Sequence, residues 1–347
     1  MAFRVPRWFV LHAFGWVYVL AQLFGRAGVA PRSAAPPSED APVVHWPAPL
    51  SRSEPAPNRD GTRPKPTDAA KKEHPSATLT FRLEHGFDAP FGKPNAYVYV
   101  PRAYDPAAPL RIITIFHGFK NCIASYVSPH GQMCLEGHDV GTGYDLPTQM
   151  EKAGTGAILV VPEISYGITS SDPGRLGESG EFRAFLTELL DALAPTIGRR
   201  RVEDIERFAL LASSGGYQAL EPVLDHGGVP VTDLYLLDAF YLYPDSAVGR
   251  FLHGALESYK PGAKNPRRFG ILYSRKGGAM PQTEVLRAKA IEWLHAAGED
   301  ELGHFDPSGE LPTIDELSKP VYILKVILMH DYIVGRYFWQ MIKAGGV

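Results

Sequence analysis

Short apolar runs that alternate with amphipathic segments make up the chain from Thr78 onward. Most runs are continuously apolar, which is typical of strands covered on both faces of a parallel sheet. They predict eight strands, at residues 78–83, 96–100, 111–116, 157–161, 208–212, 234–237, 269–273 and 321–329. The segments between them have apolar residues at helical spacing and predict helices at residues 146–153, 181–193, 216–224, 247–256, 284–297 and 332–342. This alternation indicates an α/β domain with a mostly parallel sheet and helices on both faces.

Residues 1–30 have the pattern of an export signal or membrane anchor. Arg4 and Arg7 precede an almost uncharged apolar run at residues 8–24, and small residues that suit a cleavage site follow it. The run is longer than most signal sequences and nearly long enough to cross a bilayer, so an uncleaved anchor is the alternative. A buried core helix is a third interpretation of this run. It is disfavoured because the segment that follows directly is expected to be disordered.

Proline is concentrated in that next segment. Of the 31 prolines in the chain, 11 lie within residues 31–75, among alanine, serine and charged residues. The segment has no hydrophobic periodicity and cannot bury enough apolar area to offset the entropy of ordering, so it predicts a disordered, semi-rigid linker. Residues 76–347 remain as one α/β domain of ordinary size, which we expect to be the catalytic domain.

Overall composition narrows the class of protein only slightly. The 347 residues are 45% apolar and 21% charged, as in an average globular protein. The net charge of −3 gives no sign of a nucleic-acid partner, and we expect none.

Polar residues of catalytic types follow most of the predicted strands, where parallel sheets place their ligand sites. The most informative stretch is ASSGG, at residues 212–216. A nucleophile elbow needs small residues two positions before and after the nucleophile, because the turn from strand to helix is sharp. A centre at Ser214 places Ala212 and Gly216 at those positions, whereas a centre at Ser213 places a leucine there. An ordinary glycine-rich turn capped by a serine is the alternative.

A serine nucleophile needs a base to accept its proton and an acid to orient that base. His330 follows the last strand and is the expected base, with His304 as the alternative. Asp238, directly after the sixth strand, is the expected acid because the loop after the seventh strand contains no carboxylate; an ordinary turn cap is its other interpretation. The backbone N–H groups of Phe119 and Gly215 are the expected oxyanion donors.

These residues resemble the site of an α/β-hydrolase. The resemblance rests on residues 116–119 (FHGF), residues 213–217 (SSGGY), Asp238 and His330. It implies the α/β-hydrolase fold over about residues 78–345 and acyl transfer through an acyl-serine, with no cofactor. Two features depart from the commoner pattern: Ala212 replaces a glycine, and the acid follows the sixth strand instead of the seventh. The resemblance identifies no subfamily with a defined substrate.

Both cysteines of the chain, Cys122 and Cys134, lie in a long polar segment beside the expected oxyanion donors. In an exported protein, two cysteines this close indicate a disulfide, here one that staples a loop over the site. A metal site is the alternative because His130, His138 and Asp139 lie nearby, although in no familiar ligand spacing. We expect the disulfide and no metal.

Four residues are candidates for the substrate pocket: His117, Glu163, Tyr217 and Phe240. Glu163, with acidic residues of the loop after it, would favour a cationic group on the substrate. Tyr217 and Phe240, together with Tyr241 and Tyr243, would form an aromatic wall of the pocket, or else pack against the sheet.

Together these features predict an exported serine hydrolase that cleaves an ester, as a carboxylesterase does. A peptidase or amidase would use the same residues, and a non-catalytic envelope-binding protein would keep the fold without the chemistry. A metal-dependent enzyme would instead use the loop at residues 122–139. We expect a small-molecule or peptide acyl substrate and a periplasmic, cell-surface or secreted location, with residues 8–24 as a candidate membrane tether.

Overall fold

The computed structural model describes residues 75–89, 93–134, 140–165, 171–259, 266–276 and 278–347. The chain divides into two units, Met1–Asp68 and Ala69–Val347, and every described element belongs to the second. The expected signal or anchor, the candidate tether at residues 8–24 and nearly all of the expected linker lie outside the described residues. Within the described part of the chain, no helix has both the length and the apolar character needed to cross a membrane.

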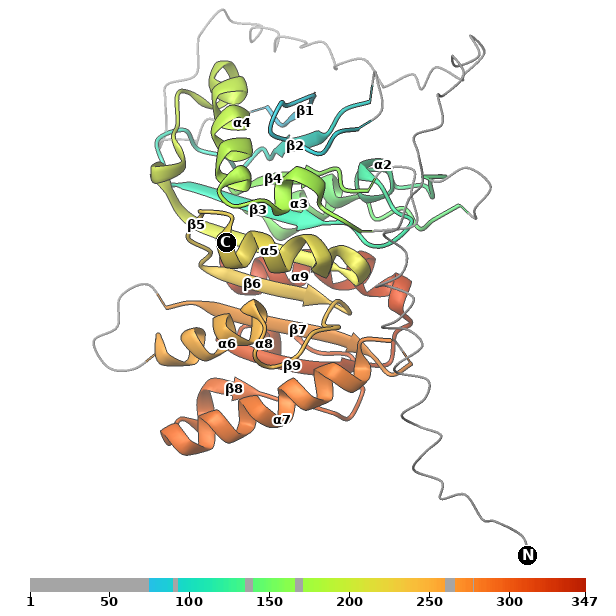
Figure 1. Ribbon diagram of the computed structural model, residues 1–347, viewed down its shortest axis with the longest axis vertical. Helices are drawn as coiled ribbons and strands as arrows, with labels where there is room; N and C mark the ends of the chain where they lie inside the picture. Colours follow the sequence, from blue (N-terminus) through green and yellow to red (C-terminus); the bar gives the residue numbers. More distant parts are fainter. Residues whose placement is uncertain (1–74, 90–92, 135–139, 166–170, 260–265, 277) are drawn as a thin grey trace, which may run out of the picture. The chain divides into compact units, whose positions relative to one another are not determined.

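A nine-stranded sheet forms the centre of the second unit (Figure 1). Its order is β1-β2-β4-β3-β5-β6-β7-β9-β8. The strands are β1 Ala77–Phe81, β2 Ala96–Val100, β3 Leu110–Phe116, β4 Ile158–Pro162, β5 Ile205–Ser213, β6 Asp233–Leu237, β7 Arg268–Ser274, β8 Gly303–His304 and β9 Val321–Val326. Strand β2 pairs antiparallel with both of its neighbours, β1 and β4. All other pairs are parallel, so β3 to β7 and β9 end at one common edge of the sheet.

Helices cover both faces of this sheet. They are α2 Ile123–Val127, α3 Leu146–Ala153, α4 Glu181–Ile197, α5 Tyr217–His226, α6 Ala247–Glu257, α7 Met280–Ala297, α8 Ile314–Leu317 and α9 Ile333–Gly345. One buried cluster lies under α4, α5, α6 and α7, and a second lies under α2, α3, α8 and α9. Successive strand residues such as Leu210 and Leu211 point into different clusters. This alternation explains why the central strands are apolar at every position.

The predicted α/β architecture is confirmed. All eight predicted strands are present as β1 to β7 and β9, and all six predicted helices are present. The sequence did not predict β8, α2 or α8, because each is too short to show a period of its own. The last predicted strand was too long. The observed strand β9 ends at Val326, and the apolar residues Ile327 and Met329 that follow it are exposed.

Candidate active site

Ser214 lies at a sharp turn between β5 and α5. Its backbone φ is 51°, in the left-handed region that residues other than glycine rarely adopt. A single 3-10 turn, Ser214–Gly216, joins the strand to the helix. A Cβ atom on Gly216 would come within 2.5 Å of the carbonyl oxygen of Phe116, so only glycine fits there. This strained, sterically closed turn has the geometry of a nucleophile elbow.

Asp238 and His330 form a hydrogen-bonded pair at the same edge of the sheet. Asp238 follows β6 and is fully buried, also with a φ of 51°. Its Oδ2 lies 2.8 Å from Nδ1 of His330 and accepts a second hydrogen bond, of 2.6 Å, from Oγ of Ser274 at the end of β7. The other side-chain nitrogen of His330 is left for a reacting group, which is the arrangement of an acid that orients a base.

Two opposing effects set the pKa of His330. Burial alone would lower it, because it disfavours the charged imidazolium. The hydrogen bond that His330 donates to Asp238 and the negative charge of that carboxylate outweigh burial and raise the pKa of His330 above its ordinary value. An imidazolium formed by proton transfer from a serine is therefore stabilised.

Two backbone N–H groups lie side by side next to Ser214. A Cβ atom on Gly215 would be 3.1 Å from the backbone nitrogen of Phe119, so these two residues face the same small space. A Cβ atom on Gly118 would be 2.8 Å from Cβ of Ser214, and the glycine allows this close approach. The structure thus brings the two expected donors together beside the candidate nucleophile, as an oxyanion hole requires.

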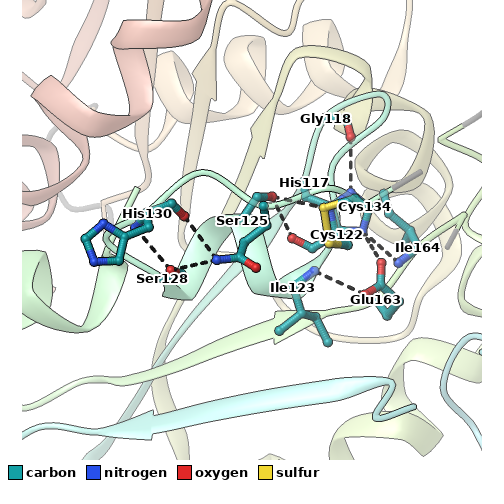
Figure 2. Close-up of a disulfide and its surroundings, with 11 residues drawn as sticks. His117, Gly118, Cys122, Ile123, Ser125, Ser128, His130, Cys134, Glu163 and Ile164 are labelled. Atoms are coloured by element: carbon teal, nitrogen blue, oxygen red, sulfur yellow. Dashed lines mark hydrogen bonds and ion pairs between the residues drawn. A yellow bond between two sulfur atoms is a disulfide. The ribbon is translucent and has the colours of Figure 1, made fainter. Parts of the chain in front are cut away.

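His117 and Glu163 are buried and bonded to each other. Glu163 Oε1 lies 2.7 Å from His117 Nε2, and Glu163 Oε2 accepts a 3.1 Å hydrogen bond from the N–H of Ile123 (Figure 2). The N–H of Ile164 also donates to His117 Nε2, at 3.0 Å. All four polar side-chain atoms of His117 and Glu163 already have hydrogen-bond partners, so neither side chain has a group left for a substrate. They connect the ends of β3 and β4 with α2 instead of lining a pocket, contrary to the expectation from the sequence.

The two aromatic pocket candidates have different surroundings. Phe240 is fully buried in the core under α4 to α7, so it packs against the sheet and does not form a pocket wall. Tyr217 is half-buried and stacks on Tyr241, with ring centroids 5.2 Å apart. The Tyr241 side chain is hydrogen bonded to Ser214. Burial, and to a smaller extent the negative charge of Asp238, raises the pKa of Tyr241 to about 12. Tyr217 and Tyr241 thus form an aromatic surface beside the candidate nucleophile.

Cys122 and Cys134 are joined by a disulfide, with Cα atoms 5.5 Å apart (Figure 2). Helix α2 begins directly after Cys122, and its Tyr126 hydroxyl accepts a 3.1 Å hydrogen bond from the N–H of Gly118. The disulfide-closed segment therefore braces the backbone that carries one oxyanion donor. Because both sulfur atoms are in the disulfide, the alternative metal site loses its thiolate ligands; His138 and Asp139 lie outside the described residues.

His304, the alternative base, lies elsewhere. It pairs with Tyr322 near the amino end of β9, whereas His330 follows the carboxyl end of that strand. Its Nε2 is 3.1 Å from Glu316 Oε1, which gives it a structural partner. His304 is therefore at the edge opposite Ser214.

Two serines near the site, Ser171 and Ser274, were not assigned a role from the sequence, and Tyr241 was expected only as part of an aromatic wall. Ser274 is a polar residue that ends an apolar strand, and this position was the available signal. Tyr241 stood out only as one of several aromatic residues in its segment. Ser171 lies in a polar loop rich in serine and glycine, where nothing distinguishes it.

The topology and the elbow together decide the fold. Strand β2 runs antiparallel, β3 and β4 exchange places in the sheet order, and the elbow follows β5 at the common edge of the parallel strands. The chain has the α/β-hydrolase fold. In this fold the candidate acid follows β6, and the end of β7, the commoner place for the acid, carries Ser274, which donates to Asp238.

No protein-family model matches the chain, and no curated protein matches it. Among solved structures, the chain is similar to a mutant feruloyl esterase module from Clostridium thermocellum complexed with sinapinate (15% identity, 81% of this chain and 92% of that chain, TM-score 0.46). It is also similar to a CE1 ferulic acid esterase from Anaeromyces mucronatus (11% identity, 81% and 94%, TM-score 0.40). A third similar structure is an acetyl xylan esterase from Aspergillus awamori (12% identity, 64% and 80%, TM-score 0.35). The assignment of the fold rests on the chain's own topology.

Proposed function

We propose that this protein is a serine hydrolase that cleaves esters through an acyl-serine intermediate. The observation that carries the proposal is the hydrogen-bonded pair of Asp238 and His330 at the sheet edge where Ser214 occupies an elbow. A non-catalytic binding protein would not need a buried carboxylate held on a histidine, so this pair favours an enzyme.

Each part of the site has a defined task in this reaction. Ser214 Oγ attacks the carbonyl carbon of the ester while His330 accepts its proton, and Asp238 holds the imidazolium that forms. The N–H groups of Phe119 and Gly215 donate to the negative oxygen of the tetrahedral intermediate. His330 then returns the proton to the leaving alcohol, which leaves the acyl group on Ser214.

Hydrolysis of the acyl-serine repeats the same steps with water. His330 removes a proton from the water molecule that attacks the acyl carbon, and the same two N–H groups stabilise the second tetrahedral intermediate. Its collapse releases the carboxylic acid, and His330 returns the proton to Ser214 Oγ. The chain's own residues supply every acid, base and donor in this sequence of steps.

Exposed apolar side chains favour an ester that carries an apolar group. Phe119 follows β3, Tyr243 follows β6, and Met329 and Tyr332 flank His330 after β9; all four are exposed. They lie on the same segments as the candidate acid, base and oxyanion donor, so they are placed to contact the acyl or alcohol part of a substrate. We infer a carboxylic ester with an aryl or alkyl group of some size.

The location proposed for the domain is outside the cytoplasm. Support comes from the disulfide between Cys122 and Cys134, since disulfides persist mainly in oxidising compartments, and from the export-like pattern of residues 1–30. Mass spectrometry of protein taken from its native compartment tests this. Two free thiols there would contradict the location.

A kinetic panel tests the proposed activity. The purified protein is assayed on short-chain, long-chain and aryl esters and on peptide amides, alongside the Ser214→Ala variant. We expect ester hydrolysis whose kcat/KM increases with the size of the apolar group and which Ser214→Ala abolishes. Cleavage of peptide amides without ester hydrolysis would identify a peptidase instead, and full ester hydrolysis by Ser214→Ala would contradict the mechanism.

A further inference from the structure

Ser171 is a buried serine whose hydroxyl has no hydrogen-bond partner among the described residues. Its exposure is 1%, and its Oγ atom is fully enclosed. A buried hydroxyl without a partner costs free energy, so folded proteins leave few of them. Where one persists, a role in the functional state is a reasonable physical explanation, because a substrate can supply the missing partner.

The position of this hydroxyl is specific. A Cβ atom on Gly215 would collide with Ser171 Oγ and would lie 3.1 Å from the backbone nitrogen of Phe119. Ser171 Oγ and the backbone nitrogen of Phe119 therefore both lie next to Gly215, and Phe119 and Gly215 carry the two expected oxyanion donors. Glycine at position 215 allows this close packing, whereas a side chain there would collide with Ser171 Oγ.

The backbone of Ser171 is fixed against the elbow. Its N–H donates a 3.3 Å hydrogen bond to Oε1 of Gln218, in the first turn of α5, the helix that follows Ser214. The hydroxyl can still rotate about its Cβ–Oγ bond, since no hydrogen bond from the described residues holds it. It is thus positioned by the backbone and free to point its hydrogen toward a new acceptor.

We propose that the Ser171 hydroxyl is a third donor to the oxyanion, together with the N–H groups of Phe119 and Gly215. This inference rests on the proposed function and deepens it. When the carbonyl carbon becomes tetrahedral, the negative oxygen accepts a hydrogen bond from Ser171 Oγ–H, and no proton is transferred. The hydroxyl is unpaired before the reaction and paired in the transition state. It therefore stabilises the transition state more than the bound substrate, and this difference increases the rate.

The Ser171→Ala variant tests this role. Loss of one oxyanion donor typically lowers kcat by about 100-fold to 1,000-fold, and we expect a loss of at least about tenfold, with KM changed by less than about threefold. Affinity for an aryl trifluoromethyl ketone, which forms an oxyanion on the nucleophile, should fall in proportion to kcat. The melting temperature should be unchanged or higher, because the variant removes an unsatisfied buried hydroxyl.

A matched control is available in the same domain. Thr114, in the middle of β3, has another buried hydroxyl without a partner among the described residues. Thr114→Val removes that hydroxyl at constant volume and should leave kcat and ketone affinity unchanged.

The outcomes separate this inference from the proposed function. If the wild-type protein hydrolyses no ester, the proposed function fails. If it does, and Ser171→Ala keeps full kcat and full affinity for the ketone, only the role of Ser171 is wrong. Unfolding of Ser171→Ala, or an equal loss of activity in Thr114→Val, would also overturn it, because either result points to packing.

Discussion

Ser214 and Asp238 have the same unusual backbone conformation, with φ at 51° in both. For an L-amino acid this region is less favourable than the right-handed one by about 1–2 kcal/mol. Both residues follow neighbouring parallel strands, β5 and β6, at the same edge of the sheet. Backbone strain of this kind is stabilised by the surrounding core and is common at functional sites, which agrees with the proposed roles of the two residues.

A glycine at position 214 should relieve the backbone strain and so increase the free energy of unfolding relative to an alanine there. Ser214→Gly and Ser214→Ala both remove the nucleophile, so both should be inactive. The glycine variant relieves the left-handed strain, and we expect it to be more stable than the alanine variant by about 1 kcal/mol. Urea unfolding of the two variants measures the difference, and equal stabilities would contradict the strained elbow.

Replacement of the acid should change the pH profile in a defined direction. Neutral His330 is the base, so kcat/KM should fall as pH drops through its raised pKa. In Asp238→Asn the negative charge is gone and burial dominates, which lowers the pKa of His330 and moves the acid limb to lower pH. The maximal rate should also fall, by about 10⁴-fold, since the imidazolium is no longer stabilised. Rate measurements across about pH 5 to 9 check both effects, and an acid limb that stays in place or moves to higher pH would rule out this pairing.

The residues of the site were predictable to different degrees. Ser214, Asp238 and His330 could be proposed because each follows a strand of the parallel sheet, and the sheet brings strand ends together. Glu163 also follows a strand, but its burial against His117 and α2 depends on a neighbouring loop whose path the sequence does not reveal. Phe240 was wrongly expected in the pocket because an aromatic side chain suits a core and a pocket equally well.

Helix α2 is the element that links the disulfide to the chemistry. Its first N–H group, that of Ile123, donates to Glu163, and its Tyr126 hydroxyl accepts from the N–H of Gly118, the residue before Phe119. The helix has only five residues and is too short to be stable alone. The disulfide at Cys122 restricts the segment that contains α2. Without this restriction, we expect α2 to be held less firmly against Gly118 and Glu163.

Removal of the disulfide should therefore affect stability and rate together. The bond joins residues 12 positions apart. In the Cys122→Ser, Cys134→Ser double variant we expect a loss of about 3 kcal/mol in the free energy of unfolding, from the entropy of the freed loop. We also expect a lower kcat, because the Phe119 donor is less well held. Denaturant unfolding and ester kinetics test this, and a variant with wild-type kcat would show that α2 does not support the oxyanion hole.

On the scale of the whole molecule, the sheet joins parts of the chain that are distant in sequence. Strand β5 lies beside β6, and only β7 lies between β6 and β9, so the ends of these parallel strands bring Ser214, Asp238 and His330 to one edge. The sequence could predict this architecture because long apolar strands and periodic helices repeat it many times. It could not predict β8, whose two residues follow from the path of the chain after α7 and not from any pattern of their own.

Covalent labelling identifies the nucleophile without an assumed substrate. The wild-type protein, Ser214→Ala and the matched neighbour variant Ser213→Ala are treated with a fluorophosphonate probe, and the modified residue is located by peptide mass spectrometry. We predict one adduct on Ser214 in the wild type and in Ser213→Ala, and none in Ser214→Ala. An adduct on another residue, or undiminished labelling of Ser214→Ala, would contradict the account.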